Sequence, residues 1–346
     1  MSESDVVPPE GVVMQMVMGA WVAAAISGVT RLDIPDLLAE HGPCTAAQLA
    51  ERSPIPLHPE ALQRALRACA SLGLFSESSE GVFGLTPLSE VLTRDSKSSV
   101  KGIAQMFGAS WWKVWSGFAE AVKTGRSQAT AQLGMEYWEY CNENPDELLA
   151  FGEAMKANSH RSTLGLLEHV DFSDARQVVD VAGGLGHLTL ALLDRYPKLR
   201  GTVLDLPKIV PLAQEHLGQV APSVRERIEF RGGDMFESVP AGDVYIMKHI
   251  IHDWDDASCL KLLKNCRASM DPSGRVICVD AVLPPLGTTG ATPAKLLDLN
   301  MLVSFQGKER TREQWSALYE AAGLRISTIT PLQDNFGTSI VVGTAV

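Results

Sequence analysis

Residues 179–186 read Val179-Asp180-Val181-Ala182-Gly183-Gly184-Leu185-Gly186, an apolar strand that ends in a glycine-rich turn. Glycine has no Cβ, so three glycines at a strand-to-helix turn let the backbone approach a ligand closely. After this point short β-branched apolar runs alternate with helical periodicity, which is typical of βαβ units. The segment therefore begins an α/β domain near residue 175, and the chain before it has almost only helical signals.

The glycine-rich turn lacks the features that bind pyrophosphate. The dinucleotide pattern G-x-G-x-x-G fails because Thr189 stands where its third glycine would be, and the turn has no phosphate-binding lysine. Asp205 ends the next predicted strand, nineteen residues after Gly186, where an acid can accept hydrogen bonds from both ribose hydroxyls. The alternative is an aspartate that only caps the turn before Pro207. Together the two features predict a nucleoside site without a phosphate requirement, which suits S-adenosylmethionine.

The second half predicts a mostly parallel sheet. Strands are expected at residues 177–182, 201–204, 228–231, 244–248, 275–280, 325–330 and 339–343, with helices between the first five. Only residues 331–338 join the last two, and parallel strands need about a dozen linking residues, so these two form an antiparallel hairpin. The predicted fold class is α/β, a Rossmann-like sheet of seven strands whose last strand is antiparallel. This is not the pattern of a nicotinamide-binding domain.

The N-terminal half predicts a winged-helix layout. Thr45 is an N-cap candidate, residues 60–72 are amphipathic, and residues 73–86 contain a hairpin pattern. Residues 60–101 hold five Lys/Arg and five Asp/Glu, so the face has no basic stripe for DNA. We therefore predict an all-helical, winged-helix-like dimerisation domain over residues 1–105, with a DNA-binding regulator as the less favoured alternative. The catalytic domain is expected over residues 106–346, with a helical connector at 106–175.

Charge and cysteine content restrict the class of protein. The 346 residues include 30 Lys+Arg and 41 Asp+Glu, a net charge of −11 that opposes a nucleic-acid partner. The six cysteines form no C-x-x-C pair, and the acidic N-terminus differs from a signal peptide, so we expect free thiols and a cytoplasmic protein.

Residues 11–30 carry no charge and are long enough to span a bilayer. They lack a Leu/Ile/Phe block and a basic flank, which favours a buried subunit interface over a membrane helix.

Further motifs follow in one order along nearly the whole chain. In the second half they are the 180–186 turn, Asp205-Leu206-Pro207, Gly233-Asp234-Met235-Phe236, Lys248-His249-Ile250-Ile251-His252-Asp253-Trp254, Val282-Leu283-Pro284 and Gly307-Lys308-Glu309-Arg310-Thr311. In the first half they are Leu85-Thr86-Pro87-Leu88 and Phe151-Gly152-Glu153-Ala154-Met155. With these motifs the chain resembles the class I small-molecule O-methyltransferases of the caffeic-acid and hydroxyindole type, including bacterial antibiotic-tailoring enzymes.

The resemblance implies a homodimeric enzyme that methylates a phenolic or polyketide-like hydroxyl of a small aromatic molecule. The methyl donor would be S-adenosylmethionine and the second product S-adenosylhomocysteine, with no metal. The motifs are also compatible with an alternative, in which this chain is a relative that keeps the cofactor but catalyses hydroxylation, decarboxylation or a pericyclic step. Formation of S-adenosylhomocysteine together with a methylated product distinguishes the two.

The resemblance also implies the cofactor site. Asp205 would hold the ribose, Asp234 and Met235 would meet the adenine, and Lys248 would lie against the adenine side. The full expected set is Asp180, Gly183, Gly184, Gly186, Asp205, Leu206, Gly233, Asp234, Met235, Phe236 and Lys248. The family usually has glycine where Ala182 stands, and a methyl group is tolerated there if the backbone φ is negative.

His252 is the expected general base. A phenol has a pKa near 10 and an imidazole near 6.5, so a positioned histidine can take the proton as the phenol oxygen attacks the methyl group. A carboxylate on the other ring nitrogen would fix the tautomer, and Asp280 and Glu309 are the candidates. The family usually has glutamate at Asp280, and the shorter side chain puts its contact with His252 in question. Asp253 is expected to cap a helix or face away.

Two further sets of residues are expected from position and residue type. His249 and His252 are one helical turn apart, a spacing that suits zinc, but no third ligand is predicted beside them, so we expect no metal site. The substrate pocket is expected from apolar or family-like positions, although a plain aromatic core is an equal alternative for the aromatic residues. The expected pocket residues are Trp111, Phe151, Met155, Asn158, Asn300, Met301 and Phe305.

Overall fold

The computed structural model describes residues 8–144, 147, 162–290, 292–333 and 336–346. Phe151, Met155 and Asn158 of the expected substrate pocket lie outside the described residues. The chain divides into two compact units. The first comprises residues 1–116 and 135–158, and the second comprises residues 117–134 and 159–346.

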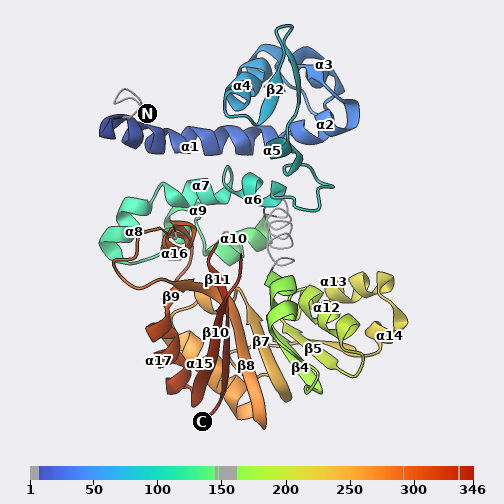
Figure 1. Cartoon of the computed structure of the whole chain (residues 1–346), viewed down its shortest axis with the longest axis vertical. Coiled ribbons are helices and arrows are strands. Elements are labelled where there is room, and N and C mark those ends of the chain that lie inside the picture. The colour runs from blue at the N-terminus through green and yellow to red at the C-terminus, as the bar shows by residue number, and fades with distance from the viewer. Residues whose placement is uncertain (1–7, 145–146, 148–161, 291, 334–335) are drawn as a thin grey trace, which may run out of the picture. The chain divides into compact units, whose positions relative to one another are not determined.

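The first unit is mostly helical and contains a small sheet, which lies beside α3 and α4 (Figure 1). Strands β1 (Cys44–Thr45), β3 (Val82–Leu85) and β2 (Phe75–Glu77) pair antiparallel in that order, which confirms the expected hairpin. Thr45 begins α3 with a capping box to Gln48, as its N-cap position predicted. The helices are α1 (Pro9–Arg31), α2 (Ile34–His41), α3 (Ala46–Arg52), α4 (Pro59–Ser71), α5 (Pro87–Glu90), α6 (Lys101–Met106), α7 (Ser110–Trp115) and α10 (Tyr137–Glu143).

Helix α1 is long, apolar and mostly uncovered. It is the one helix in the described part of the chain that could cross a membrane by length and composition, and only 11% of its most apolar window is buried. Burial is confined to its C-terminal end, at Ser27, Val29 and Thr30. Met16, Val17 and Trp21 are 73%, 63% and 72% exposed. An apolar surface of this kind marks an interaction site.

The second unit holds the main sheet, with strand order β10-β11-β8-β7-β4-β5-β6 (Figure 1). Its strands are β4 (Gln177–Val181), β5 (Arg200–Asp205), β6 (Ile228–Gly232), β7 (Gly242–Lys248), β8 (Met270–Leu283), β9 (Arg310–Thr311), β10 (Leu324–Pro331) and β11 (Thr338–Ala345). The pairs from β6 to β8 are parallel, and β11 runs antiparallel to both β8 and β10, which confirms the expected fold. Short β9, parallel to the end of β8, was not expected.

Helices cover both faces of this sheet because neighbouring residues in each strand point to opposite sides. Val179 packs into one core with Leu262 and Trp315, and Val178 packs into the other with Leu192. Because both faces are covered, the sequence of each central strand is an almost continuous run of apolar residues. The helices are α8 (Phe118–Thr124), α9 (Ala129–Leu133), α12 (His187–Arg195), α13 (Val210–His216), η2 (Leu217–Gln219), α14 (Pro222–Arg225), η3 (Ile251–Asp253), α15 (Asp256–Ser269), α16 (Thr292–Ser304) and α17 (Arg312–Ala321).

The strand order reverses beside β4. The chain proceeds from β4 outward through β5 to β6, then returns to place β7 on the other side of β4. In open α/β sheets, ligands bind outside the carboxyl ends of the strands at such a reversal. The residues that follow β4, β5, β6, β7 and β8 therefore meet at one end of the sheet.

Candidate active site

The turn after β4 adopts backbone angles that few residues tolerate. Ala182, Gly184 and Gly186 have φ of +56°, +58° and +76°. The N–H of Ala182 donates a 2.7 Å hydrogen bond to the carbonyl of Leu204 in β5, which holds the turn against the neighbouring strand. The expectation of a tolerated methyl group rested on a negative φ, and this condition is not met. The left-handed conformation costs a non-glycine residue roughly 1–2 kcal/mol.

Replacing Ala182 with glycine is expected to raise the free energy of unfolding by about 0.5–1 kcal/mol, because the strained φ no longer carries a Cβ. Urea denaturation measures the change. Ala317→Gly is the matched control, since Ala317 is an exposed residue inside α17 and its loss costs helix stability. An Ala182→Gly protein less stable than wild type would contradict the strain.

Asp180 lies beneath the turn as a buried carboxylate. Its Oδ2 accepts a 2.8 Å hydrogen bond from the Thr189 hydroxyl, and a Cβ at Gly183 would lie 2.5 Å from its Cγ. Burial raises the pKa of Asp180 to about 6, against the effects of Thr189 and Lys248. Burial lowers the pKa of Lys248, and attraction to Asp180 and Asp280 opposes that shift. The carboxyl ends of β4 and β7 thus share a charged, partly desolvated interior.

Asp205 connects the first two cofactor motifs. Its Oδ2 accepts a 2.7 Å hydrogen bond from the N–H of Gly184, and its Oδ1 accepts one of 2.7 Å from the N–H of Leu206. Its backbone carbonyl accepts from the N–H of Gly233. Burial raises the pKa of Asp205, and the two backbone hydrogen bonds oppose that shift. Each carboxylate oxygen keeps a lone pair, so the side chain can still accept from a diol.

The loop after β6 is held by an asparagine that sequence reasoning missed. The Nδ2 of Asn265, on α15, donates 3.0 Å hydrogen bonds to the carbonyls of Met235 and Phe236. Asp234 closes the loop by accepting a 2.8 Å hydrogen bond from the N–H of Phe236, and the Phe236 ring stands edge-on to Trp254 at 4.7 Å. Asn265 lies thirty residues from its partners on an otherwise ordinary helix, so no local pattern singles it out.

Three carboxylates surround His252. Its Nδ1 lies 2.8 Å from Glu309 Oε1 and 3.7 Å from Asp280 Oδ1, so only Glu309 is within hydrogen-bond distance. Its Nε2 lies 3.5 Å from Asp253 Oδ1. The expectation that Asp253 faces away is therefore wrong, because the short η3 turn brings its side chain back toward the ring. Asp280 and Glu309 are both at or near zero exposure.

The electrostatics of this cluster favour a positively charged ring. Burial by itself would lower the pKa of His252, but the charges of Glu309, Asp253 and Asp280 outweigh it and raise the pKa to about 10. Burial, opposed by His252, raises the pKa of Asp280 to about 8 and that of Asp253 to about 6. His252 and Asp280 therefore hold protons at neutral pH and release them in the alkaline range, whereas Asp253 has lost its proton by neutral pH.

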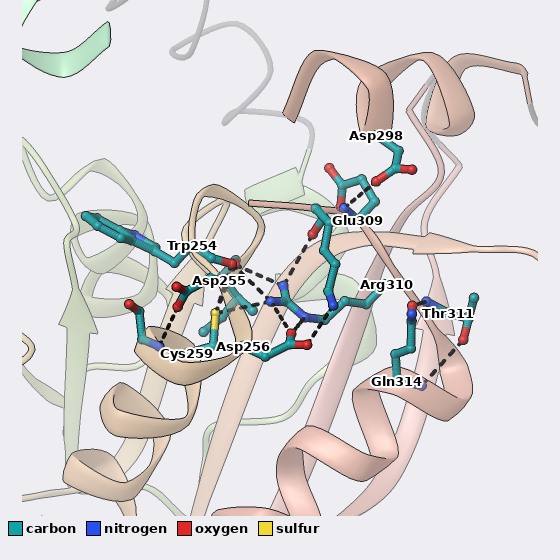
Figure 2. Close-up of polar contacts among 12 residues, drawn as sticks. Trp254, Asp255, Asp256, Cys259, Asp298, Glu309, Arg310, Thr311 and Gln314 are labelled. Carbon is teal, nitrogen blue, oxygen red and sulfur yellow. Dashed lines mark hydrogen bonds and ion pairs between the residues drawn. The ribbon is translucent and has the colours of Figure 1, made fainter. Parts of the chain in front are cut away.

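Arg310 ties the His252 segment to the Glu309 segment (Figure 2). Its side chain is 1% exposed. Nη1 donates a 3.0 Å hydrogen bond to the carbonyl of Ile251, and Nη2 donates one of 3.0 Å to the carbonyl of Trp254 and one of 2.8 Å to Asp256 Oδ1. The guanidinium thus holds the backbone on both sides of His252. The planar guanidinium group of arginine carries five N–H donors, so it can donate to several acceptors at once.

Glu309 is held from its other side. Its backbone N–H donates a 2.9 Å hydrogen bond to Oδ1 of Asp298, on α16, and Figure 2 shows the two residues side by side. Burial raises the pKa of Asp298 against this hydrogen bond. Glu309 and Arg310 therefore form one rigid support for the histidine, built from β9 and the residue before it.

The expected substrate residues divide between the units. Asn300 and Met301 lie on α16 and Phe305 follows it, and all three are buried. Trp111 lies on α7 in the first unit, edge-on to Phe107 at 5.3 Å. Their part in a pocket stays a prediction.

Comparisons with known proteins agree with this geometry. Family models match an O-methyltransferase domain at residues 115–325 and an O-methyltransferase dimerisation domain at residues 14–95. The phenazine O-methyltransferase PhzM of Lysobacter antibioticus is 34% identical over 340 residues, which is 97% of this chain and 96% of that protein. The mitomycin biosynthesis 6-O-methyltransferase of Streptomyces lavendulae is 35% identical over 93% of this chain and 91% of its own.

A solved structure extends the comparison to bound ligands. It is the O-methyltransferase NcsB1 from neocarzinostatin biosynthesis, in complex with S-adenosylmethionine and 2-hydroxy-5-methyl naphthoic acid. It superposes with a TM-score of 0.81 at 29% identity, covering 94% of this chain and 96% of its own. With the matching domain models and relatives, this chain belongs to the S-adenosylmethionine-dependent small-molecule O-methyltransferases that carry an N-terminal dimerisation domain.

Proposed function

We propose that the enzyme methylates a hydroxyl on an aromatic small molecule and that His252 is the general base. The observation that carries this proposal is the 2.8 Å contact between His252 Nδ1 and Glu309 Oε1. A carboxylate there keeps the proton on Nδ1 and leaves the lone pair on Nε2. Nε2 then accepts the hydroxyl proton as the oxygen forms its bond to the methyl carbon.

The cofactor roles are proposed residue by residue. S-adenosylmethionine supplies a methyl group on a positively charged sulfur, already activated for in-line displacement. Asp205 would accept from the ribose hydroxyls, since each of its oxygens keeps a lone pair, and Asp234, Met235 and Lys248 would border the adenine. The reaction needs no metal as written, because the carboxylate-supported histidine supplies the base and the sulfonium supplies the leaving group.

Mass spectrometry with deuterated methyl donor tests the substrate class. The full chain is incubated with S-adenosylmethionine labelled in its methyl group and with a panel of phenols, hydroxyphenazines and hydroxynaphthoates. We expect labelled methyl ethers and S-adenosylhomocysteine in equal amounts, and no reaction with the same compounds already O-methylated. A product that has lost carbon dioxide or gained only oxygen would instead support the cofactor-retaining alternative.

We also propose that α1 forms a homodimer interface, with the dimerisation domain over residues 1–105 and the catalytic domain over residues 106–346. The family model of the dimerisation domain covers most of α1. Between its charged ends, Glu10 and Arg31, the exposed surface of α1 is formed mainly by large apolar side chains, among them Met16, Val17 and Trp21. Burying one such side chain contributes about 1.5–3 kcal/mol. A second copy that covers this surface suits a cytoplasmic protein and removes the need for a bilayer around α1.

Trp21→Glu is expected to convert the dimer to a monomer, because it puts a charge at the centre of the apolar surface without a partner. Light scattering coupled to size exclusion measures the mass. Leu286→Glu is the matched control, since Leu286 is fully exposed on the second unit and its replacement should leave the dimer intact. A Trp21→Glu protein that stays dimeric at low micromolar concentration would contradict the proposed interface.

A further inference from the structure

The imidazole of His249 and the carboxylates around His252 are not all used by methyl transfer. His249, His252 and Asp280 each offer a ligand atom, and the three atoms lie within 4.8 Å of one another. His249 Nδ1 is 4.0 Å and His252 Nδ1 is 3.7 Å from Asp280 Oδ1. The sequence provided no third ligand beside the two histidines, and the structure provides it from the end of β8.

Buried carboxylate oxygens point to a missing ligand at this place. Both oxygens of Asp280, and Oε2 of Glu309, are buried and accept no hydrogen bond among the described residues. Both side chains have zero exposure, so bulk water does not serve them. A buried carboxyl oxygen that accepts no hydrogen bond costs free energy, and coordination of a cation is one way to recover it.

His249 is held in a strained conformation that aims its ring into the cluster. Its φ is +57°, in the left-handed region that non-glycine residues rarely adopt. Its side chain is 13% exposed, and its Nε2 lies 3.5 Å from the Ser162 hydroxyl. A metal-ligating histidine commonly places its second nitrogen against such a polar group. Methyl transfer as proposed gives the His249 ring no task.

We propose that His249, His252 and Asp280, with Glu309 as fourth ligand, bind a divalent transition metal of the zinc class. Bonds of about 2.0–2.1 Å in a tetrahedral site place donor atoms about 3.3 Å apart. The separations among His249, His252 and Asp280 therefore close by roughly 0.5–1.5 Å on binding. The contact between His252 and Glu309 widens slightly, and both changes are within the reach of side-chain rotation. Two imidazoles favour Zn²⁺ or Co²⁺ over Mg²⁺, and two carboxylates neutralise the charge.

Metal in this site would inhibit methyl transfer by fixing the wrong tautomer of the base. The Nδ1 proton of His252 leaves when the metal bonds to that nitrogen. A neutral imidazole then carries its proton on Nε2, so Nε2 has no lone pair for the substrate proton. Metal binding is independent of the proposed function, whereas this inhibition rests on His252 being the base.

Binding is measured without turnover, by calorimetry with ZnCl2 and by the visible absorption of the Co²⁺-loaded full chain. We expect one metal per chain, the spectrum of four-coordinate Co²⁺, and no binding of MgCl2. His249→Asn keeps a residue that tolerates positive φ and should weaken Zn²⁺ binding at least about tenfold. His249→Gly should do the same if the asparagine variant folds poorly. His216→Asn is the control, because His216 and His187 form another close imidazole pair, with ring centroids 5.0 Å apart.

Turnover supplies the second measurement. Zn²⁺ should inhibit the wild-type enzyme reversibly, with activity restored by a chelator, and His249→Asn should be correspondingly less sensitive. No stoichiometric Zn²⁺ binding by wild type, or equal binding by wild type and both His249 variants, would overturn the site. Stoichiometric binding lost in both His249 variants, without inhibition of wild type, would retain the site and instead reject His252 as the base.

Discussion

His252→Ala is expected to lower kcat by about 10²- to 10⁴-fold while the affinity for S-adenosylmethionine changes little. The loss follows from the geometry, because the ring of His252 is the group that Glu309 holds at 2.8 Å. Single-turnover kinetics with labelled cofactor measures the chemical step, and calorimetry measures cofactor binding. His169→Ala, which removes an exposed histidine, is the control.

The pH profile provides an independent readout for the same residue. His252 acts as a base only when deprotonated, and its pKa is raised to about 10. The rate of the chemical step in wild type should therefore rise with pH from 7 through 9. Glu309→Gln removes a charge that stabilises the imidazolium, so its rise should occur at lower pH, with a lower maximum because the tautomer is less well held. Unchanged turnover in His252→Ala would reject the proposed base.

Gly307→Ala is expected to lower kcat by about 10²-fold or more and to destabilise the protein by about 1–3 kcal/mol. A Cβ at Gly307 would lie 1.8 Å from the carbonyl oxygen of His252 and 2.5 Å from the carbonyl carbon of Asp253. Both contacts are to backbone, so no side-chain rotation relieves them. The segment that carries Glu309 must move away, and the contact of Glu309 with His252 lengthens.

Kinetics and thermal unfolding measure the two effects of Gly307→Ala. Gly218→Ala is the matched control, because a Cβ at Gly218 meets nothing within 4 Å and its φ is not positive. The control should change neither kcat nor Tm appreciably. Wild-type kcat and Tm in Gly307→Ala would show that the two segments are not packed as closely as described.

Much of the fold could be predicted because its signals are local. The apolar run of β4, the glycine-rich turn after it and the position of Asp205 place a nucleoside site at the end of the sheet. The short link before β11 required an antiparallel pair, which the structure contains. The two-residue β9 carried no such signal, since a strand that short has no periodicity.

The active site was harder to predict because its contacts join distant segments. The order of the motifs along the chain identified His252, Asp280 and Glu309, but not which carboxylate reaches the ring. The structure places Glu309 within hydrogen-bond distance and Asp280 beyond it, and it turns Asp253 inward rather than away. Asn265 was not foreseen, because a lone polar residue on a helix has no local signature.

The sequence by itself determined the mostly parallel α/β sheet, the antiparallel pairing of its last two strands and the identity of the residues at the carboxyl ends of the strands. These follow from periodicity, turn chemistry and loop length, which act over a few residues. Only the tertiary structure decided the positive φ of Ala182, the hydrogen bonds of the buried Arg310 guanidinium and the proximity of His249 to Asp280. Those features arise where segments about 20 to 60 residues apart are buried in the same interior. Backbone angles and protonation states there are determined by packing and by neighbouring charges rather than by local sequence propensity.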